Sequence, residues 1–268
     1  MAFSDSTRAS IDSRSKVLQL GKDLLQYGIA DLMRSPKRAA AYWRRIASAG
    51  IVEPLARTDD SSPIPVCDVE SLLPDCNAIP VTLADYRYEN GDMPLHELIT
   101  LCRTVRHRRP KKIFEIATFL GGTTLQLAAN TGGDAVIYTL DLPPPGHPDY
   151  VPPKVIDADL DVYPPEPGVR FRDSPHSVKI RQLFGDSRVF DFSPHFGGVD
   201  LVLVDGCHHY DFVRRDTENA LRMRSPGGIV FWHDYAPHAP DVVKLLNELC
   251  RVIPLTKISG TSLVFHAG

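Results

Sequence analysis

Apolar runs and segments of helical periodicity alternate along the chain downstream of residue 94. Five near-continuous apolar runs have the length of buried strands: residues 112–117, 135–140, 180–184, 199–204 and 229–232. Apolar residues at helical spacing mark the helices expected around them: 95–105, 125–130, 210–223 and 242–249. This alternation predicts an α/β domain with a mostly parallel sheet and helices on both of its faces.

The first 80 residues have a different texture. Two stretches with helical periodicity, 17–27 and 39–49, precede a loop-like sequence over residues 57–65. We therefore expect residues 1–80 to form a helical and loop extension, and residues 81–268 to form the α/β domain. The second stretch carries basic and aromatic side chains, which favours packing on the domain or on another copy of the chain.

Composition narrows the class of protein. The 268 residues carry a net charge of -3, the opposite sign from a chain that grips nucleic acid electrostatically. Apolar runs stay far below the roughly 20 residues of a membrane span, and the first 20 residues lack the apolar core of a secretory signal. The five cysteines form no closely spaced pair, so a reduced, cytoplasmic location without membrane or nucleic-acid partners is expected.

Prolines concentrate in one segment. Ten of the 23 prolines lie between residues 143 and 175, where they prevent a long regular helix. We expect this segment to be a lid-like insertion beside the ligand site, because long irregular connections usually have such roles.

Polar residues follow most of the expected strands. In open α/β sheets the ligand crevice lies at the carboxyl ends of the strands, so these residues should share one rim. The rim collects a glycine turn and four acids: Gly121-Gly122, Asp141, Asp186, Asp205 and Asp234.

The glycine turn and Asp141 together suit a cofactor that contains adenosine. Glycines before a helix allow close approach of a ligand, and an acid after the second strand can accept hydrogen bonds from a ribose. Neither the dinucleotide pattern GxGxxG nor the phosphate-binding P-loop is present, and a purely structural turn is the alternative. Asp186-Ser187 would border adenine, or else cap a helix.

Two strand ends carry the remaining chemistry. Asp205, His233 and Asp234 offer two carboxylates and an imidazole, which suit Mg²⁺ or Mn²⁺; helix capping and a structural histidine are the alternatives. His208 has the chemistry of a general base, and His209 is its competitor.

The ordered series of these segments resembles a known family. Its carriers span residues 114–124, 138–141, 182–187, 200–210 and 226–235. Over roughly residues 80–266 the chain resembles class I S-adenosylmethionine-dependent methyltransferases, methyltransferase family 24. The related branch contains macrocin, cephalosporin-hydroxylase and catechol O-methyltransferase-like enzymes.

The resemblance implies a Rossmann-like sheet of seven strands whose last strand is antiparallel, closed by residues 253–258 and 262–266. It implies cofactor contacts by the first glycine turn and by acids along the rim: Glu115, Ala117, Gly121, Gly122, Thr123, Asp141, Asp186, Ser187 and Asp205. It also implies a divalent cation, Mg²⁺ or Mn²⁺, on Asp205, His233 and Asp234, and catalysis by His208 and Asp205.

Three departures from the family pattern stand out. Ala117 replaces the usual first glycine, His233 replaces an acid, and His208 replaces the lysine base of catechol-type enzymes. The expected reaction is O-methylation of a small sugar, polyol or catechol-like acceptor. A non-catalytic binding protein with this fold, and a nicotinamide-dependent oxidoreductase, are the alternatives.

Overall fold

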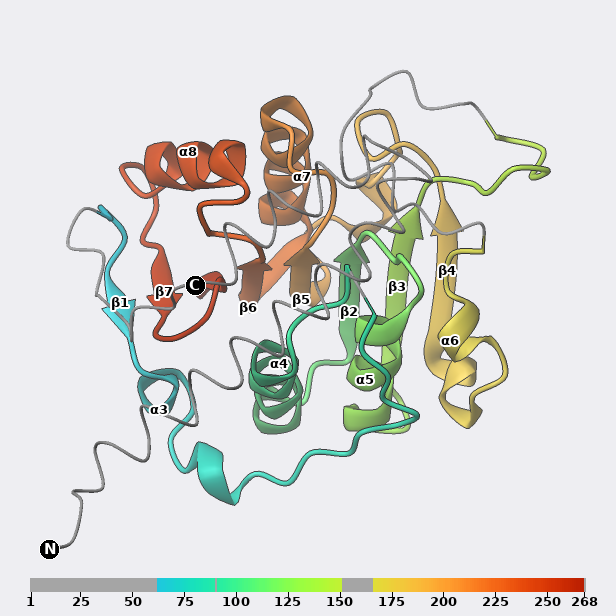
Figure 1. Ribbon diagram of the computed structural model, residues 1–268, viewed down its shortest axis with the longest axis horizontal. Coiled ribbons are helices and arrows are strands. Elements are labelled where there is room, and N and C mark those ends of the chain that lie inside the picture. The colour runs from blue at the N-terminus through green and yellow to red at the C-terminus, as the bar shows by residue number, and fades with distance from the viewer. Residues whose placement is uncertain (1–61, 90, 151–165, 268) are drawn as a thin grey trace, which may run out of the picture. The chain divides into compact units, whose positions relative to one another are not determined.

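The computed structural model describes residues 62–89, 91–150 and 166–267 (Figure 1). The expected helices at 17–27 and 39–49 lie outside these residues, as does the middle of the proline-rich segment. The chain divides into two units, residues 1–55 and residues 56–268, and all described residues belong to the second. The expected boundary near residue 80 stays a prediction.

Eight strands of the described residues form a single sheet. Along the chain they are β1 (Val66–Cys67), β2 (Lys112–Ile116), β3 (Val136–Asp141), β4 (Ile180–Phe184), β5 (Val199–Val204), β6 (Arg224–Trp232), β7 (Thr256–Ile258) and β8 (Val264–Ala267). Their order across the sheet is β1-β7-β8-β6-β5-β2-β3-β4. β8 is antiparallel to both β6 and β7, whereas the other pairings are parallel.

Helices connect these strands. In the part of the chain that the structure describes, the α-helices are α3 (Val69–Leu72), α4 (Leu95–Arg108), α5 (Gly122–Asn130), α6 (Val169–Arg172), α7 (Tyr210–Met223) and α8 (Pro240–Leu249). Short 3₁₀ turns are η1 (Cys76–Ala78), η3 (Pro175–Lys179) and η4 (Ser193–His195). Among the described residues, no helix combines the length and apolar character that crossing a bilayer requires.

The sheet is buried on both faces because alternate strand residues feed two apolar cores. One core joins Phe114 and Val202 to α7 and α8, and the other joins Ile113 and Leu201 to α4 and α5. Figure 1 shows α4 and α5 in front of the central strands. Burial on both faces explains why these strands appear in the sequence as continuous apolar runs.

The topology places a switch point in the middle of the sheet. From β2 the chain proceeds outward to β3 and β4, then returns to β5, on the other side of β2, and continues to β6. Ligands in open α/β sheets bind at such a point, outside the carboxyl ends of the strands. This Rossmann-like arrangement confirms the predicted fold class.

Two details differ from the sequence prediction. The sheet has eight strands rather than seven, because residues 66–67 of the expected extension pair with β7 and lengthen one edge. β6 begins at Arg224, so residues 224–228 extend the strand that was expected at 229–232. The pairing of β5 with β6 shifts register between Val199 and Leu201, which accommodates these residues within the strand.

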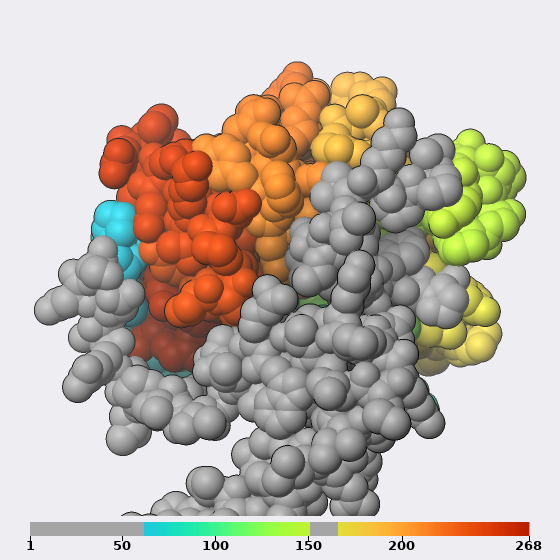
Figure 2. Space-filling view, turned by 45° about the horizontal axis from the view of Figure 1, so that its top comes forward, coloured from blue at the N-terminus to red at the C-terminus, as the bar shows by residue number. Residues whose placement is uncertain are grey.

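The proline-rich segment is partly described. Residues 142–150 follow β3, and the ring of His147 packs against Phe184 at the end of β4, with 4.9 Å between ring centroids. Figures 1 and 2 both show this yellow-green stretch on the side of the sheet away from the red C-terminal elements. Beyond the gap, the segment forms α6, a single helical turn.

Candidate functional site

The expected rim exists. Glu115 pairs in register with Thr139 of β3 and Leu203 of β5. β2 therefore lies between β3, which ends at Asp141, and β5, which is followed directly by Asp205. His233 and Asp234 follow β6, whose end lies beside the end of β5. The fold therefore brings Glu115, Asp141, Asp205 and the 233–234 pair to one end of four adjacent strands.

Glu115 is a buried acid within a hydroxyl cluster. Its side chain is 1% exposed, and its Oε2 accepts hydrogen bonds from Thr139 Oγ1 at 2.7 Å and from Thr124 Oγ1. Burial raises the pKa of Glu115 to about 8. A carboxyl group that keeps its proton at neutral pH can donate a hydrogen bond as well as accept one.

Asp141 organises the turn after β2. Its Oδ2 accepts from the backbone N–H groups of Thr118 at 2.9 Å and Phe119 at 2.7 Å, and its Oδ1 accepts from Leu142 N at 2.7 Å. Burial raises the pKa of Asp141 to about 6. Three of the roughly four acceptor positions of a carboxylate are thus used by the backbone, a structural role beyond the expected contact with a ribose.

The turn itself has an unusual backbone. Ala117, Phe119 and Gly121 have positive φ angles of 83°, 51° and 84°. A Cβ at Gly121 would approach Phe171 to 2.5 Å, and one at Gly122 would approach Arg170 Nη1 to 2.8 Å. The space beside both glycines is therefore filled by α6, a packing reason for glycine that exists alongside any ligand.

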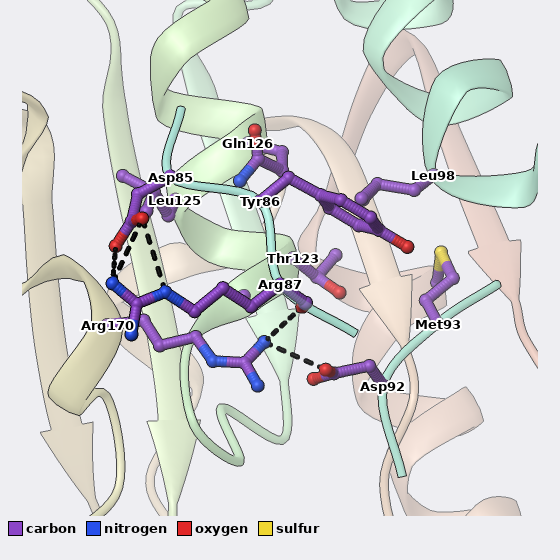
Figure 3. A pocket seen from close by; sticks show the side chains of 11 residues that line it. Asp85, Tyr86, Arg87, Asp92, Met93, Leu98, Thr123, Leu125, Gln126 and Arg170 are labelled. Atoms are coloured by element: carbon purple, nitrogen blue, oxygen red, sulfur yellow. Dashed lines mark hydrogen bonds and ion pairs between the residues drawn. The ribbon is translucent and has the colours of Figure 1, made fainter. Parts of the chain in front are cut away.

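A pocket adjoins the first turns of α5 (Figure 3). Arg170 extends across it from α6, and its Nη1 donates to Asp92 Oδ2 at 2.8 Å and to the carbonyl oxygen of Arg87 at 3.1 Å. Residues from four segments line the pocket: Asp85, Tyr86, Arg87, Asp92, Met93, Leu98, Gly122, Thr123, Leu125, Gln126 and Arg170. Thr123, one of the expected cofactor contacts, is therefore next to a hollow at the N-terminal end of α5.

Asp186 and Ser187 follow β4 in a tight turn. The carboxylate of Asp186 accepts hydrogen bonds from Arg188 N at 2.9 Å and from the Arg188 guanidinium. No helix begins directly after Asp186, so the carboxylate is not a helix cap. Burial opposes ionisation, but these hydrogen bonds outweigh it and lower the pKa of Asp186. Ser187 hydrogen-bonds the buried Asp216. The contact of this pair with adenine stays a prediction.

Asp205 and His233 form the centre of a buried polar cluster. His233 Nδ1 lies 2.7 Å from Asp205 Oδ1, and His233 Nε2 lies 2.7 Å from Glu97 Oε2. Burial raises the pKa of Asp205, even though the nearby His233 opposes that shift. Burial alone would raise the pKa of Glu97 too, but the hydrogen bond and charge of His233, together with hydrogen bonds from Ser262, outweigh burial and lower that pKa.

Asp234 is surrounded by imidazoles. Its Oδ2 lies 2.7 Å from His208 Nε2 and 3.0 Å from His233 Nδ1, and its Oδ1 lies 2.8 Å from His238 Nε2. Burial would raise the pKa of Asp234, but these rings, His233 first, hold it well below its usual range. Burial would lower the pKa of His233, but Asp205 and Asp234 raise it well above its usual range.

The donor set fits a divalent cation. One ligand atom from each of Asp205, His233 and Asp234 lies within 4.8 Å of the other two, so the three converge on one point. Two carboxylates and one imidazole suit Mn²⁺, Fe²⁺ or Zn²⁺ better than they suit Mg²⁺, because Mg²⁺ prefers sites made of oxygen ligands alone. Among the described residues, this is the group that could hold a metal ion.

The two candidate bases differ in their surroundings. His208 is half-buried and contacts Asp234, whereas His209 is exposed at the N-cap of α7 with its ring edge towards Phe212. A carboxylate beside an imidazole orients the ring and stabilises its protonated form. The geometry therefore favours His208 over His209.

Sequence reasoning missed three residues of this cluster and pocket. Glu97 falls on the apolar face of α4 beside Leu98 and Leu101, and an acid on such a face was the available signal. His238 and Arg170 gave no comparable signal, since their partners lie in loops whose course the sequence does not determine.

Comparison with known proteins gives one family. Residues 114–235 match a family model described as a methyltransferase domain, Methyltransf_24, the family that the sequence resembles. The match begins in β2 and ends just after Asp234, so it contains every rim residue named above except Glu97 and His238. No curated protein matches the chain.

Solved structures similar to this chain include three methyltransferases. The SAH-bound methyltransferase PaMTH1 of Podospora anserina is 16% identical with a TM-score of 0.47, covering 66% of this chain and 79% of its own. The O-methyltransferase TomG of Streptomyces achromogenes, in complex with SAM, is 16% identical with a TM-score of 0.45, covering 65% and 79%. The O-methyltransferase of Bacillus cereus, in complex with SAH, is 15% identical with a TM-score of 0.46, covering 74% and 89%.

Proposed function

Because residues 114–235 match the model of a methyltransferase domain family, we propose that the protein transfers a methyl group from S-adenosylmethionine to a hydroxyl group of a small acceptor. The observation that carries the proposal is the rim itself. Glu115, Asp141, Asp205 and Asp234 lie at the ends of adjacent strands, on both sides of the topological switch point.

The cofactor would lie across the turn after β2. Asp141 would accept a hydrogen bond from a ribose hydroxyl with the acceptor position that the backbone leaves unused. The buried Glu115 holds Thr124 and Thr139 in place beneath that turn. S-adenosylmethionine supplies an electrophilic methyl group on its sulfonium sulfur. The acceptor oxygen would attack the methyl carbon in line, so that the C–O bond forms as the C–S bond breaks and S-adenosylhomocysteine leaves.

His208 would remove the proton of the acceptor hydroxyl. Its Nε2 lies 2.7 Å from Asp234 Oδ2, which orients the ring. Asp234 then stabilises the imidazolium that forms, as the acid does in a catalytic His–Asp pair. This arrangement gives Asp234 two roles, one towards His208 and one towards the metal-ligand group.

Asp205, His233 and Asp234 would hold a divalent cation. Such an ion lowers the pKa of a bound hydroxyl and orients the acceptor. An acceptor with two adjacent hydroxyl groups would use this centre best, which favours sugars, polyols and catechol-like rings.

The proposal is tested with labelled S-adenosylmethionine and a panel of catechols, sugars and polyols. His208→Gln should lower the turnover rate by a factor on the order of 10² to 10⁴, since a general base contributes that much. His209→Gln is the matched control and should retain the wild-type rate. Equal loss in both variants contradicts the assignment of the base, and binding of S-adenosylmethionine without product from any acceptor supports a non-catalytic protein.

A further inference from the structure

Glu97 is a buried acid that lies outside the matched family segment. It belongs to the first turn of α4, and its side chain is 3% exposed. Both of its oxygens are engaged: Oε2 lies 2.7 Å from His233 Nε2, and Oε1 accepts from the backbone N–H of Ser262. An ionisable group is rarely buried so completely without specific partners.

The partners of Glu97 stand directly behind the metal-ligand group. Ser262 Oγ accepts from Asp234 N at 3.3 Å, and the carbonyl oxygen of Ser262 accepts from Tyr235 N at 3.0 Å. Asp234 needs this support, because its backbone φ of 60° is a left-handed conformation that costs energy in residues other than glycine. Glu97 and Ser262 together brace the turn that carries His233 and Asp234.

The position of Glu97 determines which face His233 presents. A carboxylate oxygen only accepts, so the hydrogen between Glu97 and His233 resides on Nε2. Without a metal, Nδ1 also carries a hydrogen towards its own carboxylate partners, and a bound cation would displace that hydrogen. The opposite nitrogen, Nδ1, points at Asp205 Oδ1 at 2.7 Å and at Asp234 Oδ2 at 3.0 Å. The ring is therefore oriented with one nitrogen towards α4 and the other towards the two acids.

We infer that Glu97 is a positioning residue of the cation centre, which fixes His233 so that Nδ1, and not Nε2, ligates a divalent metal between Asp205 and Asp234. Histidines that bind metals almost always donate their other ring N–H to a carboxylate or a carbonyl, and this outer partner sets the orientation and basicity of the ligand. The inference rests on the proposed function, since it presupposes the cation that assists methyl transfer.

The first test measures metal binding without cofactor or acceptor. Titration of the metal-free protein with Mn²⁺, followed by calorimetry and by electron paramagnetic resonance, should show one site in the wild type. Glu97→Gln should bind Mn²⁺ about 10- to 100-fold more weakly, the usual effect of losing an outer carboxylate. Glu218→Gln, on the exposed face of α7, is the matched control and should bind as the wild type does.

Each outcome of this titration is decisive. Equal Mn²⁺ affinity in Glu97→Gln and the wild type overturns the inference, as does a wild type that binds no Mn²⁺. Binding of S-adenosylmethionine and product formation are measured separately, so a failure of the proposed methyl transfer is distinguished from a failure of the role of Glu97.

A second test does not depend on the folding of the variant. In the wild type labelled with ¹⁵N-histidine, addition of diamagnetic Zn²⁺ should shift the Nδ1 resonance of His233 and leave Nε2 protonated. The absence of this signal in His233→Asn assigns it. Ligation through Nε2, or a His233 signal that Zn²⁺ leaves unchanged, would contradict the inference.

Discussion

At the scale of single residues, the rim contains acids in buried positions, where burial disfavours their ionised form. Glu115 is the extreme case, because it is fully enclosed by the sheet and its pKa is raised to about 8. The sequence predicted that this acid would border a ligand. It could not predict the hydroxyl groups of Thr124 and Thr139 around it, since those contacts depend on the register of β2 with β3 and on the start of α5.

The raised pKa makes stability depend on pH. Between about pH 4.5 and pH 8 the folded protein keeps the Glu115 proton that the unfolded chain has lost, so stability falls as pH rises. Glu115→Gln removes this dependence. As pH rises, the unfolding free energy of the variant minus that of the wild type should therefore increase by up to about 1.4 kcal/mol per pH unit. Urea denaturation of cofactor-free protein from pH 5 to pH 8 measures the difference. Parallel profiles for the wild type and the variant would contradict the burial of an uncharged acid, and Glu218→Gln serves as the exposed control.

Ala117 provides a second prediction at this scale. Its φ of 83° costs about 1–2 kcal/mol for a residue with a Cβ, whereas glycine adopts it freely. Ala117→Gly should therefore stabilise the protein by about 0.5–1 kcal/mol after the larger unfolded-state entropy of glycine is subtracted. Ala128→Gly, in the buried part of α5, should instead destabilise it by about 1 kcal/mol. Thermal denaturation of both variants measures these changes. A destabilised Ala117→Gly would contradict the claim that the backbone at Ala117 is strained.

At the scale of elements, periodicity predicted what packing against the sheet imposes. The strand at 199–204 and the helix at 210–223 have the predicted bounds, because each buries a continuous apolar face. Elements with little apolar content were harder to predict. The two residues of β1 and the single turn of α6 depend on pairing with β7 and on contacts of Arg170 and Phe171, which leave no periodic signal.

Arg170 joins α6 to the segment that leads into α4. Its guanidinium forms ion pairs with Asp92 at 2.8 Å and Glu89 at 3.1 Å, and the Arg170 and Asp92 side chains are 11% and 9% exposed. Arg170→Ala leaves Asp92 as an uncompensated buried charge and should destabilise the protein by about 3 kcal/mol.

The matched control is Arg172→Ala, which breaks the exposed ion pair with Glu166. That variant should remain within about 0.5 kcal/mol of the wild type, because exposed pairs contribute little. Urea denaturation measures both variants, and faster hydrogen exchange in residues 85–89 should accompany the loss of Arg170. Similar unfolding free energies for the two variants would show that the buried Arg170–Asp92 ion pair does not stabilise the protein.

At the scale of the whole molecule, the order of strands creates the site. The sequence predicted the acids at the strand ends, and the rule for open α/β sheets placed them on one rim. It could not predict that Glu97, which is 136 residues away from His233 in the chain, completes the cluster. That contact follows from α4 packing across the sheet and from the β7–β8 hairpin, which brings Ser262 to the same carboxylate.

The central claim is that this rim binds S-adenosylmethionine. Calorimetric titration of the purified full-length protein with S-adenosylmethionine tests it most directly, with NAD as the comparison ligand that also contains adenosine. We expect saturable binding of S-adenosylmethionine at one site per chain and no heat with NAD. Absence of binding at millimolar S-adenosylmethionine, or binding of NAD in its place, would contradict it.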